Sequence, residues 1–357
     1  MSRLPPPLPR WDRPVTRPVL VTGGTGYIGS HTCACLQAAG YQVLIVDDLS
    51  NSERAVVTAI AGISGCRPLF EEADVRDLAR MEAIVDHYQP MATIHFAGVK
   101  SVAESARAPL KYYDVNVAGS VALLRALARS GPPCVVFSSS ATVYGEPDSL
   151  PLREDHPLRP ASAYGRSKMM VEQMLCDVCA ADPLSRVIAL RYFNPVGAHP
   201  GGTLGESPRG MPENLMPYLG RVACGASPHL SVFGNNYPTP DGTCIRDYVH
   251  VMDLAEAHVS ALRLALRRPG YQVVNIGTGV GVSVLELIEA YAVACGHALP
   301  YQIVARRAGD VACYYADPHA AEDMLGWTAQ RGLQQMCADA HRHAMGHATG
   351  TDATTTH

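Results

Sequence analysis

The stretch VLVTGGTGYIGSH, residues 19–31, places Gly23, Gly26 and Gly29 three residues apart behind a short apolar run. The run predicts a buried strand. The glycines allow a tight turn, close approach of the backbone to a pyrophosphate, and close packing of the helix that follows. The spacing therefore predicts a dinucleotide cradle between a first strand and a first helix. A glycine-rich turn of an ordinary α/β protein is the alternative for the motif alone.

Two acidic residues follow the next apolar stretches. Asp47 ends the run YQVLIV about 20 residues beyond the cradle, where a carboxylate can accept hydrogen bonds from both ribose hydroxyls. An acid at this place would repel a 2′-phosphate, so it favours NAD over NADP. Asp74 follows a third apolar stretch and is a candidate adenine contact, with a helix cap as the equal alternative.

The chain alternates β-branched runs with longer helical stretches from Pro18 to about Asn194. The runs are PVLVT, YQVLIV, ATIHF, CVVFS and RVIAL. This rhythm predicts an α/β protein with a doubly wound parallel sheet, in which ligands bind beyond the carboxyl ends of the strands. We expect a flexible Pro-rich extension over 1–16, a dinucleotide-binding domain over 17–194, a smaller α/β substrate lobe over 195–345 with some elements able to return to the first domain, and a disordered tail over 346–357.

Composition excludes several classes of protein. The 357 residues are 47% hydrophobic and 17% charged with a net charge of −4, which is typical of a globular chain and disfavours a nucleic-acid partner. Eleven scattered cysteines indicate reduced thiols. No signal-peptide pattern and no run of roughly 18 apolar residues is present, so we expect no membrane span and a cytoplasmic location.

We expect no metal site. The fourteen histidines include no H-E-x-x-H motif, and Cys176 and Cys179 form a single CxxC inside a predicted helix. His341, His343 and His347, near the tail, are expected to be solvated.

A serine, a tyrosine and a lysine supply the candidate chemistry. The segment AYGRSKMM places Tyr164 and Lys168 four residues apart on one face of a helix start. A phenol of pKa near 10 is a poor base at neutral pH, but an adjacent ammonium and a cationic nicotinamide both favour the phenolate. Ser140 follows the strand CVVFS, where its hydroxyl can bind the same reacting group.

These motifs resemble the extended short-chain dehydrogenase/reductase family, whose pattern joins a GxxGxxG loop to YxxxK. Further strings resemble the UDP-glucose 4-epimerases of that family, among them HFAGVKSVAES, FSSSATVYG, LRYFNPVGAHP and DGTCIRDYVHVMDLA. The likeness runs from about residue 18 to about 343. It implies a Rossmann-type sheet with tightly bound NAD and a nucleotide-sugar lobe, and a homodimer formed through the helices near 112–130 and 164–181.

The resemblance also implies a mechanism. Tyr164 would be the general base at the sugar 4′-hydroxyl, Lys168 would hold the nicotinamide ribose and lower the pKa of that tyrosine, and Ser140 with Thr142 would position the sugar. Hydride would leave C4′ for NAD and return to the opposite face of a 4-keto sugar. UDP-galactose and UDP-glucose would thus be interconverted, as galactose metabolism and UDP-sugar supply require, with no net oxidation.

Other contacts carry over by position. Those implied for NAD are Gly23, Gly26, Tyr27, Ile28, Gly29, Asp47, Asp48, Asn51, Ser52, Asp74, Val75, Phe96, Ala97, Gly98, Lys100, Ser140, Tyr164, Lys168 and Phe193. Those implied for the nucleotide sugar are Lys100, Ser140, Thr142, Tyr164, Asn194, Asn214, Leu215, Val232, Phe233, Arg246, Arg307, Asp310 and Tyr314. The two arginines suit a diphosphate. One departure is Val115, where many relatives have an asparagine beside the cofactor; Asn116 is adjacent and can compensate.

The resemblance also bears on substrate selectivity and on the rival functions. A bulky side chain at the position of Tyr314 excludes N-acetylated sugars in this family, so UDP-N-acetylglucosamine and its galacto epimer are expected to be poor substrates. The rivals are a nucleotide-sugar dehydratase or decarboxylase, a dehydrogenase that releases NADH, and a non-catalytic NAD sensor. A dehydratase needs carboxylates where this chain has Ser140, Ala141 and Thr142. A sensor is expected to have lost the tyrosine or the lysine.

Overall fold

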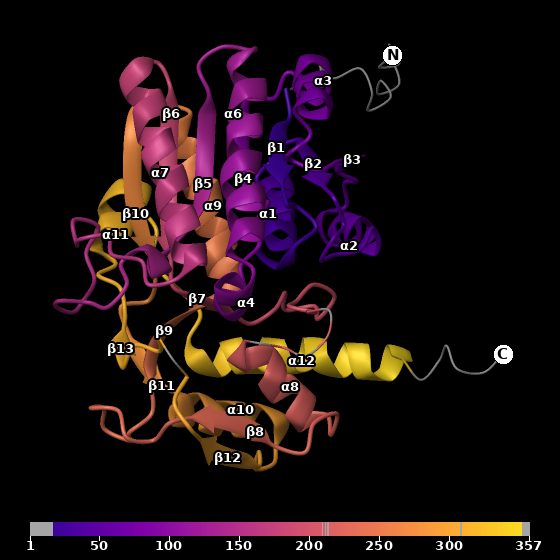
Figure 1. Cartoon of the computed structure of the whole chain (residues 1–357). Coiled ribbons are helices and arrows are strands. Elements are labelled where there is room, and N and C mark those ends of the chain that lie inside the picture. The colour runs from indigo at the N-terminus through magenta and orange to yellow at the C-terminus, as the bar shows by residue number, and fades with distance from the viewer. Residues whose placement is uncertain (1–16, 209, 211, 213, 308, 352–357) are drawn as a thin grey trace, which may run out of the picture.

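A parallel sheet forms the larger part of the molecule (Figure 1). The computed structural model describes residues 17–208, 210, 212, 214–307 and 309–351. Within them seven strands pair side by side in the order β10-β6-β5-β4-β1-β2-β3, every pair parallel. They are β1 (Val19–Thr22), β2 (Val43–Asp47), β3 (Leu69–Glu72), β4 (Ala92–His95), β5 (Cys134–Ser140), β6 (Arg186–Tyr192) and β10 (Gly270–Ile276). The expected doubly wound α/β sheet is confirmed.

Helices cover both faces of this sheet, so its central strands are buried on both sides and are rich in apolar residues. One face packs against α1 (Tyr27–Ala38), α2 (Ala55–Ser64), α9 (Val251–Ala265) and α11 (His319–Leu325). The other packs against α3 (Leu78–Tyr88), α6 (Gly119–Ala128) and α7 (Ala163–Ala181). Short turns connect them: α4 (Val102–Arg107), α5 (Pro109–Tyr112), a π-helical turn (Tyr113–Ala118) and a 3₁₀ turn (Ala141–Val143).

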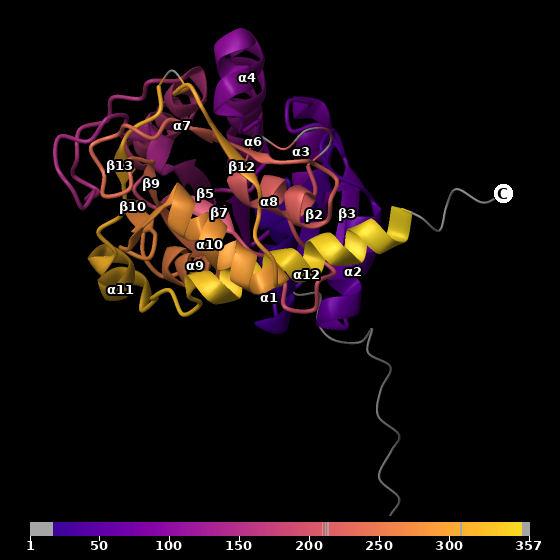
Figure 2. The same cartoon turned by 90° about the horizontal axis from the view of Figure 1, so that it is seen from below.

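A smaller lobe lies below the carboxyl ends of the main strands (Figure 1). Its strands are β7 (Asn194–Val196), β9 (Ile245–His250), β11 (Gly281–Ser283) and β13 (Cys313–Tyr314) in one sheet, and β8 (Leu230–Phe233) with β12 (Tyr301–Val304) in a pair. Figure 2 shows its helices packed together from below: α8 (Leu215–Ala223), α10 (Val284–Cys295) and α12 (Leu333–Thr351). A separate apolar core fills the lobe.

The chain crosses between the two parts more than once. Beyond residue 194, α9, β10 and α11 return to the main sheet, and β10 pairs with β6 from Gly270–Arg186 to Ile276–Tyr192. A cut at residue 194 would therefore remove the edge strand of the main sheet.

The C-terminal segment differs from expectation. Helix α12 continues to Thr351, so the expected disordered tail is wrong for residues 346–351. Residues 352–357 and the expected Pro-rich extension over 1–16 lie outside the described residues. In the described part of the chain, no helix has the length and apolar composition needed to cross a membrane.

Candidate active site

The glycine loop lies between β1 and α1, as its spacing predicts. Gly23 has φ +69°, and a Cβ there would lie 2.7 Å from the Ala97 backbone nitrogen. A Cβ on Gly29 would lie 2.2 Å from the Gly23 carbonyl oxygen. Gly26 is the residue before α1. The first backbone N–H groups of this helix have no intrahelical partner, and they face the turn. The loop can therefore bring backbone donors close to a pyrophosphate, which side chains at these positions would prevent.

Asp47 ends β2 beside this loop and is 8% exposed. Its carboxylate accepts hydrogen bonds from the Thr25 backbone N–H at 3.0 Å, from the Leu49 N–H at 3.0 Å and from the Ser52 hydroxyl at 3.2 Å. The acid that we expect to bind the ribose is thus fixed by the glycine loop itself. Asp48 instead accepts from the Ser50 backbone N–H and hydroxyl.

Asp74 does not cap a helix. Asp77 caps α3 by accepting from the Arg80 N–H, so the cap alternative for Asp74 is wrong. The Asp74 carboxylate instead pairs with Arg76, which lowers the pKa of that carboxyl. Val75 is buried and packs closely on α6, where a Cβ on Gly119 would lie 2.8 Å from its Cγ1.

The loop after β4 forms the far wall of the cradle. The backbone N–H groups of Phe96 and Ala97 donate to the Thr22 carbonyl oxygen. A Cβ on Gly98 would lie 2.8 Å from Asn116 Oδ1. Asn116 is buried in the π-helical turn, and its amide bonds both the N–H and the C=O of Val99.

The amide nitrogen of Asn116 also donates to Ser167 Oγ on α7 at 2.9 Å. Asn116 therefore ties the cofactor loop to the helix that carries the tyrosine and the lysine. Val115 stands beside Asn116 and is half-buried, and compensation of its missing cofactor contact by Asn116 stays a prediction.

Ser140 is the last residue of β5. Its hydroxyl accepts from the Thr142 backbone N–H at 3.2 Å and from the Thr142 hydroxyl at 3.0 Å. Helix α7 begins close by, since a Cβ on Gly165 would lie 2.8 Å from the Thr142 carbonyl oxygen. The two expected sugar-positioning hydroxyls therefore meet at the start of the helix that carries Tyr164.

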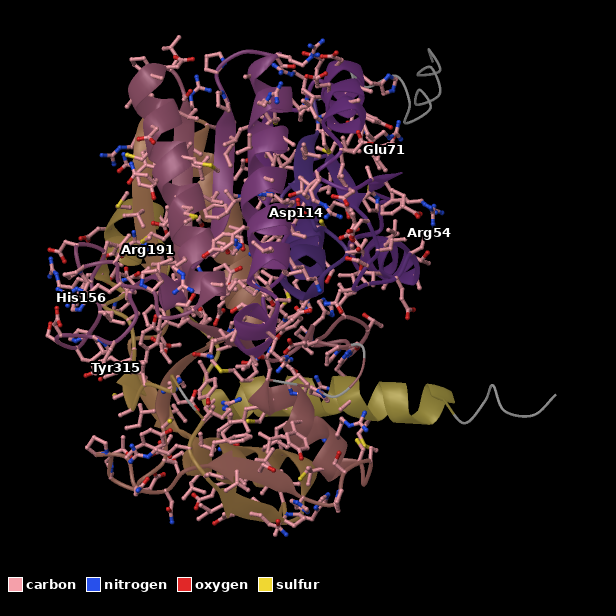
Figure 3. All side chains as sticks on the ribbon, in the orientation of Figure 1. Arg54, Glu71, Asp114, His156, Arg191 and Tyr315 are labelled. Carbon is pink, nitrogen blue, oxygen red and sulfur yellow. The ribbon has the colours of Figure 1, made fainter. Side chains whose placement is uncertain are left out.

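Tyr164 and Lys168 lie one turn apart on α7 and are both buried. The Lys168 ammonium donates to the Ser138 carbonyl oxygen at 2.8 Å, and burial lowers its pKa to about 8 while Glu172 counteracts that shift. Glu172 lies one turn further on and pairs with Arg191 of β6 at 2.6 Å (Figure 3 labels Arg191). A buried carboxylate thus supports the charge on the lysine.

The phenol of Tyr164 behaves differently from expectation. Burial raises its pKa above the ordinary value, and a hydrogen bond with the Ser140 side chain offsets only part of this rise. The Lys168 ammonium, which is expected to lower this pKa, donates to the Ser138 carbonyl oxygen. Further positive charge placed beside the phenol would favour the phenolate.

Two aromatic residues lie on the side of the site where the sugar is expected to bind. Phe193 follows β6 and lies 5.1 Å, centroid to centroid, from the ring of Tyr314 on β13. The Tyr314 hydroxyl donates to the carbonyl oxygen of Ala141, the residue after Ser140. Tyr314 is thus part of the wall that faces the candidate catalytic residues.

A cationic cluster gathers in the smaller lobe. Arg246 and Arg307 lie on either side of Asp310, with N–O distances of 3.9 and 3.2 Å. The Arg307 guanidinium stacks 4.4 Å from the centroid of Phe233 on β8, and Val232 beside it is buried. The arginines, the acid and the aromatic ring expected to bind the nucleotide are therefore brought together.

The other expected nucleotide-sugar residues lie on separate segments. Asn194 begins β7 and is exposed, and Asn214 and Leu215 stand at the start of α8. The Asn214 amide donates to Glu206 at 2.7 Å. Lys100, from the loop after β4, bonds the same carboxylate.

Some residues are missed or misplaced by sequence reasoning. His343 is expected to be solvated, but it is 6% exposed and bonds Ser207 and Gly202. Glu172 and Glu206 carry no signal in the sequence, because their roles depend on partners from distant segments. Among the described residues, no group of three or more His, Cys, Asp or Glu side chains is placed to hold a metal ion.

Known proteins match this arrangement along nearly the whole chain. The model of the NAD dependent epimerase/dehydratase family matches residues 19–277. The chain belongs to this family. A UDP-glucose 4-epimerase of Bacillus subtilis is 49% identical over 324 residues, 91% of this chain and 96% of that protein.

Solved structures of the epimerase/dehydratase family agree. A UDP-glucose-4-epimerase from Stenotrophomonas maltophila, with bound NAD and formylated UDP-arabinopyranose, has a TM-score of 0.92 at 47% identity and covers 94% of this chain and 100% of its own. One from Bifidobacterium longum, in complex with NAD+ and UDP, has a TM-score of 0.90 at 44% identity, with coverages of 93% and 99%. The expected fold and family are confirmed.

The cradle fits the cofactor of this epimerase/dehydratase family. A Cβ on Gly23 or Gly29 would collide with backbone atoms, so glycine keeps this space open. Three hydrogen bonds fix the Asp47 carboxylate beside it. Gly23, Gly26, Gly29 and Asp47 would hold NAD, with the loop over Phe96–Lys100 as the opposite wall. NAD is the cofactor of the chain.

Proposed function

We propose that this chain interconverts UDP-galactose and UDP-glucose by inverting the configuration at carbon 4′ of the sugar. The observation that carries this function is the meeting of Ser140, Thr142 and Tyr164 beside an NAD cradle, in a chain 49% identical to a UDP-glucose 4-epimerase. The chain is an isomerase, since the sugar enters and leaves at the same oxidation level.

Each side chain of the site has its own role in this reaction. Tyr164 removes the proton from the 4′-hydroxyl, while Ser140 and Thr142 hold that hydroxyl and orient the ring. Lys168 donates to the nicotinamide ribose and adds positive charge beside the phenol. Bound NAD would supply the oxidation at C4′ and the return of the hydride to the other face of the sugar. The cradle therefore has to retain its ligand between turnovers.

The electrostatics support this division. Burial raises the pKa of Tyr164, which favours the neutral phenol. A cationic ring placed against Phe193 and an ammonium that turns from the Ser138 carbonyl toward the ribose both favour the phenolate. The base is then strengthened only when the site is loaded.

The nucleotide half of the substrate suits the smaller lobe. We assign the diphosphate to Arg246 and Arg307, whose planar donors match phosphate oxygens. Asp310 bridges these two arginines, so it keeps both guanidinium groups near one place. Phe233, Val232 and Leu215 supply apolar surface for the base, and Asn194 and Asn214 supply amides.

Elimination of water is a poorer fit. The residues after β5 are Ser140, Ala141 and Thr142, none of which carries a carboxylate. Glu172 reaches the neighbouring Ser139 but is buried and paired with Arg191, so it has no access to a sugar. These positions therefore lack the acid and the base that a dehydratase needs.

One incubation tests the function. The purified protein is mixed with UDP-galactose without added NAD, and the products are separated by chromatography. We expect UDP-glucose in catalytic amount, and none from Tyr164→Phe. A 4-keto-6-deoxy product would instead indicate a dehydratase, and stoichiometric NADH a dehydrogenase. Either outcome contradicts the proposal.

We further propose that the enzyme is a homodimer. The face formed by α5, α6 and α7 exposes Leu110, Val121 and Met170 to 79%, 39% and 41%. These apolar side chains support association through the helices named from the sequence. A monomer in sedimentation equilibrium would contradict this assembly. We also place the enzyme in the cytoplasm, consistent with its eleven free cysteines, and cell fractionation tests that location.

A further inference from the structure

The segment 197–207, which follows β7 in the smaller lobe, contacts the start of the cradle. The Tyr27 hydroxyl, from the first residue of α1, donates to the Gly197 carbonyl at 2.7 Å. A bridge between Ala198 and Gly205 closes the segment into a short hairpin. Leu204, which pairs with His199 in this hairpin, is 4% exposed and packs in the core of the main sheet. The hairpin is therefore anchored to the cofactor domain.

The opposite side of the 197–207 segment is held by α12. The His343 ring bonds Ser207 Oγ at 2.9 Å and the Gly202 carbonyl at 2.8 Å. Arg342 donates to the Pro200 carbonyl at 2.7 Å. A Cβ on Gly205 would lie 2.3 Å from the His343 ring, so the hairpin rests tightly on the helix.

The Glu206 side chain lies between the loop after β4 and the start of α8. One carboxylate oxygen accepts from the Lys100 ammonium at 2.7 Å and from the Asn214 amide at 2.7 Å. The Glu206 side chain is 10% exposed and that of Lys100 is 51% exposed. The ammonium also lies 5.8 Å from the centroid of the Tyr27 ring. One acid thus joins the loop after β4 to the start of α8.

We propose that Glu206 is a positioning residue that clasps the cradle, holding Lys100 over the cofactor and linking it to Asn214 on the nucleotide-sugar side. The proposal rests on the proposed function, in which Lys100 contacts NAD and Asn214 contacts the UDP-sugar. An ammonium has three N–H donors, so Lys100 can keep its bond to Glu206 while it donates to a phosphate of the dinucleotide.

Two consequences follow for the holoenzyme. Without the negative charge of Glu206, Lys100 is free to move into solvent and the hairpin loses its tie across the cradle, so NAD leaves faster. Because Asn214 bonds the same oxygen, a UDP group that fixes Asn214 also steadies Glu206. Occupancy of the nucleotide-sugar side therefore slows NAD release, and the coupling runs through one carboxylate.

Isotope exchange tests the clasp on the holoenzyme. Purified protein is mixed with excess deuterium-labelled NAD, and the replacement of bound NAD is followed by mass spectrometry with and without saturating UDP. We expect Glu206→Gln to exchange about five- to tenfold faster than the wild type, since loss of a largely buried, hydrogen-bonded charge acts mainly on dissociation. We expect UDP to slow exchange in the wild type and to slow it less in this variant.

Glu71→Gln is the matched control. The Glu71 carboxylate also joins a cation and a neutral donor, Arg80 at 2.5 Å and Tyr88 at 2.7 Å, but at the far edge of the main sheet (Figure 3). It should leave exchange unchanged. Glu206→Asp keeps the charge and should restore most of the slow exchange, which a merely structural contact would not do.

The outcomes separate the two proposals. Exchange in Glu206→Gln within twofold of the wild type and of Glu71→Gln overturns the clasp. If Glu206→Gln does not fold, the exchange rate of Glu206→Asp and its response to UDP decide, and exchange that is fast and insensitive to UDP in this variant overturns the clasp. A chain that exchanges NAD as expected but forms no UDP-glucose from UDP-galactose keeps the clasp and loses the epimerase function.

Discussion

Replacing Tyr314 by cysteine should widen the sugar pocket and admit N-acetylated substrates. In the wild type the ring is 9% exposed, packs against Phe193 and donates its hydroxyl to the Ala141 carbonyl. A 2′-acetamido group would have to displace this ring. The substitution removes the obstacle while leaving Ser140 and Tyr164 in place.

The size of the effect follows from the contacts that displacement breaks. A hydrogen bond is worth about 1 kcal/mol net, an aromatic pair about 1 kcal/mol, and burial of the ring about 2 kcal/mol. The acetamido sugar is therefore disfavoured by about 4 kcal/mol, which is nearly three powers of ten in kcat/KM. Tyr314→Cys should recover most of that discrimination, at a cost in folding stability of about 3 kcal/mol from the cavity.

The assay compares kcat/KM for UDP-galactose and UDP-N-acetylgalactosamine in the wild type and the variant. Tyr315→Cys is the matched control, because the neighbouring ring points away from the sugar side and lies beside Gly281 (Figure 3). Comparable kcat/KM for the two sugars in the wild type would refute the reasoning. So would an equal change of their ratio in the two variants.

Three other predictions concern the base, the lysine and the buried histidines. Tyr164→Phe should lower epimerisation by at least about a thousandfold while NAD stays bound, measured by turnover and by mass spectrometry of the holoenzyme; near wild-type turnover would show that another group is the base. Lys168→Ala should lose more activity at pH 7 than at pH 9.5, because the charge that favours the phenolate is gone; a loss independent of pH would contradict this role. Burial lowers the pKa of His31 and His95 to about 3 and that of His258 to about 4, so these rings stay neutral when folded and protonate near pH 6.5 when unfolded. Their stabilisation is complete above about pH 6.5 and declines as the pH falls toward 4, by about 2 kcal/mol for each ring at pH 5. Urea unfolding at pH 7.5 and pH 5 measures this decline, and equal stability at the two values would contradict it.

The main sheet and the core of the site are predictable from sequence for a physical reason. Strands buried on both faces are rich in apolar residues, so β1, β2, β4 and β5 stand out as short β-branched runs. Residues that follow such strands meet at one edge of a parallel sheet. The pattern of apolar runs therefore suffices to place Asp47 and Ser140 near the glycine loop.

The predictions that differ from the structure concern residues whose surroundings are set by tertiary contacts. Asp74 lies where a cap is expected, but α3 begins at Leu78 with Asp77 as its cap, and Asp74 pairs with Arg76. His343 belongs to a polar stretch whose pattern predicts a solvated side chain, and only the arrival of the 197–207 segment buries it. The pKa of Tyr164 departs from expectation because burial raises it, and the YxxxK spacing does not reveal how deeply the phenol is buried.

The edge strand β10 has a consequence for how the chain is made. Strand β6 ends at Tyr192, and its partner β10 starts only at Gly270. At a synthesis rate of about 5–20 residues per second, the growing chain holds an apolar, unpaired sheet edge for several seconds. During that interval the nascent protein is open to strand pairing with its neighbours. Slow folding at this edge, rather than weak native packing, is then the step at which overproduction would lead to aggregates and at which a chaperone would help most.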